Sequence, residues 1–169
     1  MGRFPVYLIL SVLLLLTSCG YRFVGTQSRA EVRSVAVHLF LNRTLEAGVE
    51  NIVTTFLRNE LIRSKRIALV DEDKAEAMVE GFVTELTERP VSFTKEGFTL
   101  ESRVRMVVDV SLKRRLDQKV LWRVTNLSFS EEYRADSDIP TNEQRKEVAI
   151  RTIAKELARQ IHDSILSRF

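Results

Sequence analysis

Few side chains in this chain are of the types that most often carry catalysis. There is one cysteine, Cys19, and there are two histidines, His38 and His162, whose spacing suggests no pair of nucleophile and base. We interpret His38, which lies in an apolar segment, as structural, and we expect His162 to be solvated. The six glycines form no phosphate-binding fingerprint, and the carboxylates at 71–73 are explained by a solvated turn better than by a cation site. These residues predict a protein that is not an enzyme and binds no metal.

Cys19 directly follows an apolar segment at the start of the chain. Residues 6–16, VYLILSVLLLL, are shorter than the roughly 20 residues that span a bilayer and are typical of the core of a secretory signal. The sequence LTSC, Leu16–Cys19, resembles the bacterial lipobox. That resemblance implies a diacylglycerol on the Cys19 sulfur, cleavage before Cys19 and acylation of the new amine, for example with palmitate. Several acyl chains on one residue give lasting anchoring, and we expect no cofactor beyond these covalent lipids.

The remaining sequence predicts one domain behind a short lead. We expect a signal peptide at 1–18, a lipidated N-terminus and lead at 19–32, and the domain at 33–169. The 26 Lys and Arg against 23 Asp and Glu give a net charge of +3, without a strong basic block or a recognition motif. We therefore do not expect a nucleic-acid partner. Gly20, rather than aspartate, after the cysteine implies sorting to the outer membrane under the enteric rule.

Apolar periodicity predicts the elements of this domain. Strand patterns cover residues 34–39, 66–70, 76–88, 103–112 and 120–133. Helical patterns begin at Val49 and at Thr141, where Gln144 would complete a capping box. Residues 90–97 are expected to form a loop or hairpin tip, and a shift of alternation near Asn126 indicates a bulge.

The predicted fold class is α/β. The order β-α-β-β-β-β-α predicts a two-layer sandwich, with two helices on one face of a mixed sheet. The first β-α-β unit predicts a parallel crossover, and the short turn near Asp117 predicts antiparallel pairing of later strands. The opposite face of the sheet is expected to stay open and to carry Arg103 and Arg105.

Two groups of side chains could bind a ligand or a partner. The first group combines rings and cations: Arg89, Phe93, Lys95, Phe98, Arg103 and Arg105. It suits an amphiphile with acidic head groups, or it is a hairpin tip whose rings dock on their own sheet. The second group, Arg151, Lys155 and Arg159, follows helical spacing, and is either a solvated face or a contact for a partner or anionic lipid.

Several segments, taken in order, resemble the LptE family of lipopolysaccharide-assembly lipoproteins. They are CGYRF, SVAVHLFLNRTLEAGVENIVTTFLRNEL, AEAMVEGFVTEL, RPVSFTKEGFTLESRVRMVVDVSL, KVLWRVTNLSFSEEY and NEQRKEVAIRTIAKELARQI. The resemblance implies two helices on a sheet of about four strands. It also implies a lipoprotein anchored in the inner leaflet of the outer membrane, which plugs the β-barrel LptD from the periplasmic side and binds lipopolysaccharide.

The resemblance also names candidate contacts for lipopolysaccharide. The family's contact lies at the loop around Phe93 and Lys95, which makes Phe93, Lys95, Arg103 and Arg105 the lipopolysaccharide-binding candidates here. A second basic contact of the family precedes the final helix, where this chain has SDIP, with Arg134 as the nearest cation.

A different class of function also fits one segment. AVHLFLNRT is similar to the start of periplasmic activator lipoproteins of the LpoB type, which contact a cell-wall synthase. The absence of a long linker after Cys19 favours the LptE resemblance, because such an activator must reach toward the wall.

Overall fold

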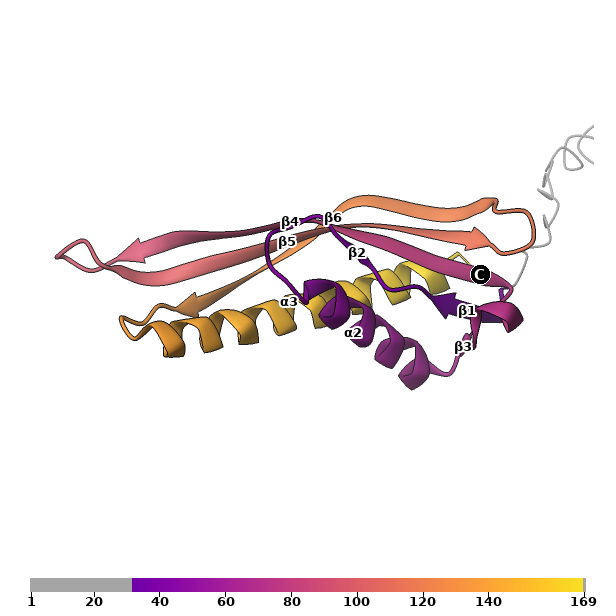
Figure 1. Cartoon of the computed structure of the whole chain (residues 1–169), viewed down its shortest axis with the longest axis horizontal. Helices are drawn as coiled ribbons and strands as arrows, with labels where there is room; N and C mark the ends of the chain where they lie inside the picture. Colours follow the sequence, from indigo (N-terminus) through magenta and orange to yellow (C-terminus); the bar gives the residue numbers. More distant parts are fainter. Residues whose placement is uncertain (1–31, 169) are drawn as a thin grey trace, which may run out of the picture.

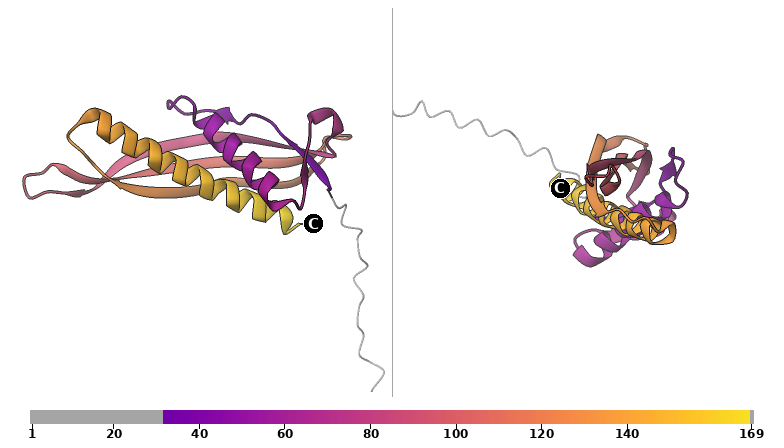
Figure 2. Two further views of the ribbon diagram at one scale, coloured as in Figure 1. Left: turned by 90° about the horizontal axis from the view of Figure 1, so that it is seen from below. Right: turned by 90° about the vertical axis from the view of Figure 1, so that its left-hand side faces the viewer.

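The domain is a two-layer α/β sandwich in which both long helices cover the same face of one mixed sheet (Figure 1). This computed structural model describes residues 32–168, so the signal peptide, Cys19 and nearly all of the lead lie outside the described residues. The predicted fold class is confirmed. The molecule is elongated, and its three long strands run along its length (Figures 1 and 2).

The sheet has six strands in the described chain, rather than the four that the resemblance implies. They are β1 (Ser34–Val37), β2 (Leu41–Asn42), β3 (Ala68–Leu69), β4 (Ala77–Phe93), β5 (Thr99–Arg114) and β6 (Val120–Arg134). Their order is β3-β1-β4-β5-β6, with β2 pairing β4 as well. The pairs β1–β3, β1–β4 and β2–β4 are parallel, and β4–β5–β6 is antiparallel. Both the predicted parallel crossover and the predicted antiparallel pairing are therefore confirmed.

One of the two additional strands, β3, lies within the segment predicted at 66–70. The other, β2, arises because β1 ends at Val37, before the predicted end at 39, and the chain leaves the sheet briefly. The amide of Phe40 donates to Thr54 Oγ1 in the first long helix, at 3.0 Å, instead of to a neighbouring strand. The chain then rejoins the sheet as the two-residue strand β2. β4 also continues through Pro90 to Phe93, so the predicted loop at 90–97 is shortened to the turn that joins β4 and β5. Pro90 is tolerated there because no strand within residues 32–168 pairs with the outer edge of that part of β4.

Two long helices, α2 (Val49–Ser64) and α3 (Ile139–Leu166), and one short 3-10 turn, η1 (Glu72–Lys74), complete the described chain. The predicted capping box at Thr141 is wrong. The helix begins earlier, and Asp138 is its N-cap, with a side chain that accepts a hydrogen bond from the Thr141 amide at 3.1 Å. Pro140 fits the first turn, where no amide proton is needed, which allows this earlier start.

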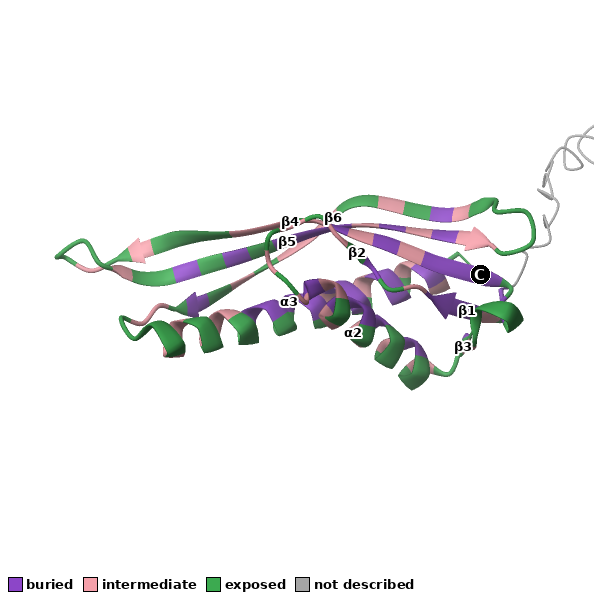
Figure 3. Ribbon diagram, viewed as in Figure 1, coloured by how far each residue is buried: buried purple, intermediate pink, exposed green. Residues whose placement is uncertain are grey.

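The core lies between the sheet and the two helices. Figure 3 shows the buried residues gathered where the helices cover the strands. The α3 stripe includes Ile153, Leu157 and Ile161, each fully buried. His162, expected to be solvated, is only 5 % exposed because it lies beside this stripe. The predicted bulge is confirmed at Asn126, which has a φ of 55° at the point where the β5–β6 register shifts.

Candidate functional site

The β4–β5 hairpin projects beyond the beginning of α3 and ends in an exposed tip (Figures 1 and 2). We call residues 91–100 the hairpin tip. The Thr94 amide donates to the Phe98 carbonyl at 2.8 Å, and Gly97 supplies the positive φ of 89° that the turn requires. Phe93 and Phe98 are 59 % and 72 % exposed, so these rings are not docked on their own sheet.

The structure brings only part of the predicted group together at this tip. Phe93, Lys95 and Phe98 lie in or beside the turn, and Lys95 is exposed, without an ion-pair partner anywhere in residues 32–168. Arg103 lies farther along β5, directly opposite Arg89. Two cations therefore face each other on the open side of the sheet, behind the aromatic tip.

Arg103 and Arg105 differ from Lys95 because both have acidic neighbours. Arg103 Nε donates to Glu132 Oε1 at 2.9 Å, and Arg105 lies 3.7 Å from Glu85. Neither carboxylate was predicted as a neighbour, because both are distant in the chain and are placed here by strand register. These partners leave Lys95 as the least compensated cation among the four predicted contacts.

The rest of the open face follows the same pattern of opposite charges. We use this name for the outward side chains of the long strands, among them Glu80, Phe82, Glu85, Arg89, Arg103, Arg105, Asp109, Lys113 and Glu132. Lys113 Nζ lies 2.5 Å from Glu80 Oε2, and the Arg43 guanidinium stacks 4.0 Å from the centre of the Phe82 ring. The face is therefore polar and largely self-neutralised.

A polar network lies under the sheet where its covered and exposed parts meet. We call it the boundary network: Glu46, Glu88, Tyr133 and Lys146. The Tyr133 hydroxyl donates to Glu88. Burial is the main cause that raises the pKa of the phenol, and this hydrogen bond is the next. Burial alone would lower the pKa of Lys146. The hydrogen bond to Glu46, 2.7 Å away, the charge of Glu46 and the charges of more distant carboxylates together outweigh the effect of burial. The pKa of Lys146 is therefore raised.

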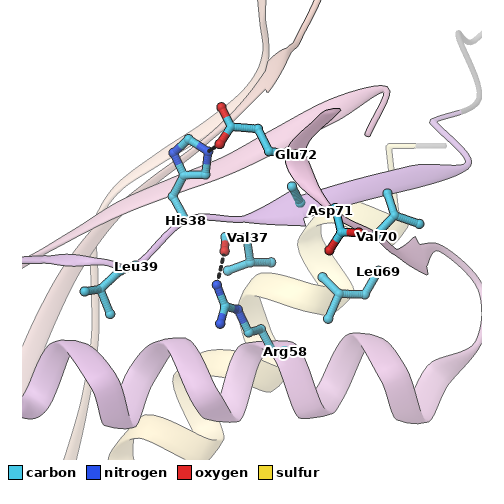
Figure 4. A pocket seen from close by; sticks show the side chains of 9 residues that line it. Val37, His38, Leu39, Arg58, Leu69, Val70, Asp71 and Glu72 are labelled. Carbon is cyan, nitrogen blue, oxygen red and sulfur yellow. Dashed lines mark hydrogen bonds and ion pairs between the residues drawn. The ribbon is translucent and has the colours of Figure 1, made fainter. Parts of the chain in front are cut away.

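A pocket of about 770 Å³ lies elsewhere, between the end of β1 and α2 (Figure 4). Arg58 Nη2 donates to the Val37 carbonyl at 2.6 Å, and His38 Nε2 lies 3.3 Å from Glu72 Oε2. The Arg58 bond attaches α2 to the end of β1. His38 Nε2 makes no hydrogen bond within residues 32–168, so the structural role expected for His38 stays a prediction.

The cation row on α3 is largely compensated. Arg151 pairs with Glu147 at 2.7 Å, and Arg159 pairs with Glu156 and, at 3.3 Å, with Asp163. Only Lys155 of this row has no ion-pair partner within the described chain. The row therefore resembles an ordinary solvated helix face.

The segment AVHLFLNRT has a local structural explanation. Asn42 Nδ2 donates to the Glu46 carbonyl at 2.7 Å and to Glu50 Oε2 at 2.9 Å. Its Oδ1 accepts bonds from Thr44, so this one amide organises the loop that leads into α2. The segment therefore has a role in folding, which accounts for its residues without a partner.

Within residues 32–168, no cluster of His, Cys, Asp and Glu has an arrangement that could hold a metal ion. No helix in the same range is long and apolar enough to cross a membrane.

Both a family model and several solved structures of known proteins match this chain. A family model described as "LptE: Lipopolysaccharide-assembly" matches residues 32–165. No curated protein matches the chain. Among solved structures, rare lipoprotein B from Shewanella oneidensis aligns with a TM-score of 0.57 and 14 % identity, over 79 % of this chain and 94 % of that one.

Two further solved structures have the same fold. A lipoprotein from Caulobacter crescentus aligns with a TM-score of 0.55 and 15 % identity, over 82 % of this chain and 90 % of that one. A minor lipoprotein from Acinetobacter baumannii aligns with a TM-score of 0.53 and 19 % identity, over 79 % and 92 % of the two chains. At such low identity, these likenesses concern the fold alone.

Proposed function

The chain belongs to the LptE family of lipopolysaccharide-assembly proteins, and from this premise we propose that it is a non-enzymatic outer-membrane lipoprotein that plugs and helps assemble the LptD β-barrel and binds lipopolysaccharide. One observation carries the proposal: the family model matches residues 32–165, almost the entire described domain. The activator alternative has only the AVHLFLNRT segment in its favour, and Asn42 accounts for that segment locally.

The open face supports the plug role. The interior of an outer-membrane barrel is polar, so a domain that fills it needs polar outer surfaces without a large uncompensated charge. Paired side chains such as Lys113 with Glu80 and Arg103 with Glu132 give this face that character. The elongated shape also suits entry into a barrel along the barrel axis (Figure 2).

The hairpin tip supports the lipopolysaccharide role. Lipopolysaccharide combines acyl chains with phosphates, and the exposed rings of Phe93 and Phe98 stand beside the uncompensated cation Lys95. The rings would pack on acyl chains, and the ammonium would compete with divalent cations for phosphates and so disperse aggregates. Arg103 and Arg105 would join as their carboxylate partners yield to phosphate, and therefore contribute less than Lys95.

The proposed anchor places this domain at the membrane. Diacylglycerol and an N-acyl chain on Cys19 would hold the protein in the inner leaflet of the outer membrane, facing the periplasm and the barrel lumen. To test this, cells are fed a labelled fatty acid and the mature protein is separated on a gel. The wild-type protein should carry the label, and Cys19→Ala should abolish it.

Binding of purified lipopolysaccharide tests the ligand part of the proposal. We expect the lipoprotein with Lys95→Glu and Arg103→Glu to bind several-fold more weakly than wild type, since reversal replaces attraction to phosphate with repulsion. Lys155→Glu is the matched control, because it reverses an equally unpaired lysine on α3. Unchanged binding in the double variant, or an equal loss in the control, would contradict the assignment.

A further inference from the structure

The β5–β6 turn, residues 115–119, presents an exposed apolar side chain at the end of the molecule opposite the hairpin tip (Figure 1). Leu116 is 89 % exposed, and among the large apolar residues that the structure describes only Leu45 is more exposed. Turns are usually built from small and polar residues, because their side chains face water. A leucine in this place therefore needs an explanation that the plug and ligand roles do not supply.

The turn holds this leucine in an ordered conformation. The Arg114 amide donates to the Lys119 carbonyl at 2.8 Å and closes the hairpin. Asp117 accepts a bond from the Lys119 amide at 3.2 Å and pairs with the Arg114 guanidinium at 3.1 Å. Because the turn is already fixed by these bonds, a surface that receives Leu116 need not order the backbone first.

Hydrogen bonds connect the turn to the point where the chain enters the domain. The Arg115 amide donates to the Glu76 carbonyl at 2.9 Å, and Arg115 Nε donates to the Ala75 carbonyl at 2.8 Å. Glu76 Oε2 in turn accepts a bond from the Arg33 amide at 2.9 Å. The turn and the first described residues therefore lie together at one end of the molecule, and two views agree on this (Figures 1 and 2).

The length of the lead keeps this end close to the proposed anchor. Thirteen residues, Gly20–Val32, separate Cys19 from the domain. Fully extended, they span at most about 45 Å. The end that carries Leu116 is the end that this tether holds near the leaflet.

The charge of the turn complements an anionic lipid surface. Within the turn, Arg114, Arg115 and Lys119 stand against the carboxylate of Asp117, which pairs with Arg114. The carboxylate of Glu76, beside Arg115, accepts the bond from the Arg33 amide. The Lys119 ammonium is exposed and has no ion-pair partner in residues 32–168. An apolar side chain flanked by cations is the arrangement that suits the boundary between head groups and acyl chains.

We propose that the β5–β6 turn rests on the anionic phospholipid leaflet that holds the anchor, with Leu116 entering the head-group layer and Lys119 meeting lipid phosphates. The inference rests on the proposed lipidation of Cys19 and adds a second contact to it. One contact at the anchor and one at the turn fix the orientation of the long axis, which the anchor alone does not.

A fluorescence experiment on the lipoprotein in vesicles tests this contact. Leu116→Cys introduces the one thiol that is free when Cys19 is acylated, and that thiol receives an environment-sensitive nitrobenzoxadiazole label. The vesicles contain phosphatidylethanolamine and phosphatidylglycerol, no lipopolysaccharide, and a trace of head-group nitroxide lipid. We expect strong quenching of the label at 116 and little at the control position in Leu45→Cys, which is even more exposed but lies in the loop before α2.

A second substitution tests the charge. Adding Lys119→Gln to Leu116→Cys should lower the quenching of the label at 116 in phosphatidylglycerol vesicles about fivefold. Adding Lys155→Gln instead should not change the quenching. Equal quenching at 116 and 45 would overturn the inference while leaving the anchor intact. Failure of every form to float with vesicles would instead overturn the anchor, and this inference with it.

Discussion

The two ends of β4 differ sharply, although they belong to one continuous strand. Residues 77–83 are all buried or half-buried, covered by the helices on one face, whereas residues 88–93 are almost all exposed. The first part lies between β5 and the parallel strands β1 and β2, while the second has β5 as its only pairing strand in the described chain. The comparison indicates that the covered half supplies stability and that the projecting half is free to serve recognition.

The side chains at the two ends fit that division. In the covered half, Gly81 leaves room for the Phe40 ring, which would lie 2.2 Å from an added Cβ. In the projecting half, large rings such as Phe98 stand in solvent. An exposed aromatic tip adds little to folding, so its presence is better explained by a ligand.

The largest expected effect on folding comes from the covered half. Leu157→Ala removes a fully buried side chain of α3 and should lower the free energy of unfolding by about 2–5 kcal/mol. Urea unfolding measures this. Under conditions where the variant remains folded, lipopolysaccharide binding should equal that of wild type. A loss of binding in the folded variant would show that the halves are not separable.

The projecting half should respond in the opposite way. Phe93→Ser with Phe98→Ser should change the free energy of unfolding by no more than about 0.5 kcal/mol, since both rings are exposed. Lipopolysaccharide binding should fall about tenfold, because two rings no longer bury apolar surface against acyl chains. Ile62→Ser, at a 58 % exposed position on α2, is the matched control. A large loss of stability with intact binding would reverse the assignment.

The boundary network, which lies between the two halves, should make the free energy of unfolding depend on pH. The pKa values of Tyr133 and Lys146 are raised above the ordinary values of 10.0 and 10.5, so the folded state holds both protons more tightly than the unfolded state does. Their contribution is complete below about pH 10 and is lost as pH rises through the folded-state values. Comparing urea midpoints at pH 8 and pH 11 measures it. Tyr133→Phe with Lys146→Met should show a smaller drop than wild type, and an equal drop would contradict this role.

The smallest expected effect concerns the open face. The Arg103–Glu132 pair is about half exposed, so its coupling free energy should be only about 0.5 kcal/mol. A double-mutant cycle with Arg103→Glu, Glu132→Arg and the exchanged pair measures it, and the exchange should restore most of the stability. If the exchange restores stability but not lipopolysaccharide binding, the cation at position 103 itself is required.

The sequence predicted what periodicity controls. The α/β layers, both helices, the crossover and the bulge at Asn126 follow from patterns within one segment. Contacts between segments were not predictable. The carboxylate opposite Arg103 depends on strand register, and the break at Phe40 depends on a hydroxyl in α2. The helix start was misplaced because Thr141 and Gln144 match a capping box as well as Asp138 and Pro140 match an earlier cap.

The candidate site was predicted only in part for the same reason. Phe93 and Lys95 are neighbours in sequence, so their gathering at the tip could be expected. The separation of Arg103 and Arg105 from the tip, and their neutralisation, emerge only when β4, β5 and β6 are aligned.

The central claim is that this domain works inside a lipopolysaccharide-assembly barrel. Affinity capture of the native lipoprotein from detergent-solubilised outer membranes, with the captured proteins identified by mass spectrometry, tests it most directly. We expect recovery of an LptD-type β-barrel in amounts close to those of the lipoprotein. Recovery of a penicillin-binding synthase without any barrel would contradict it.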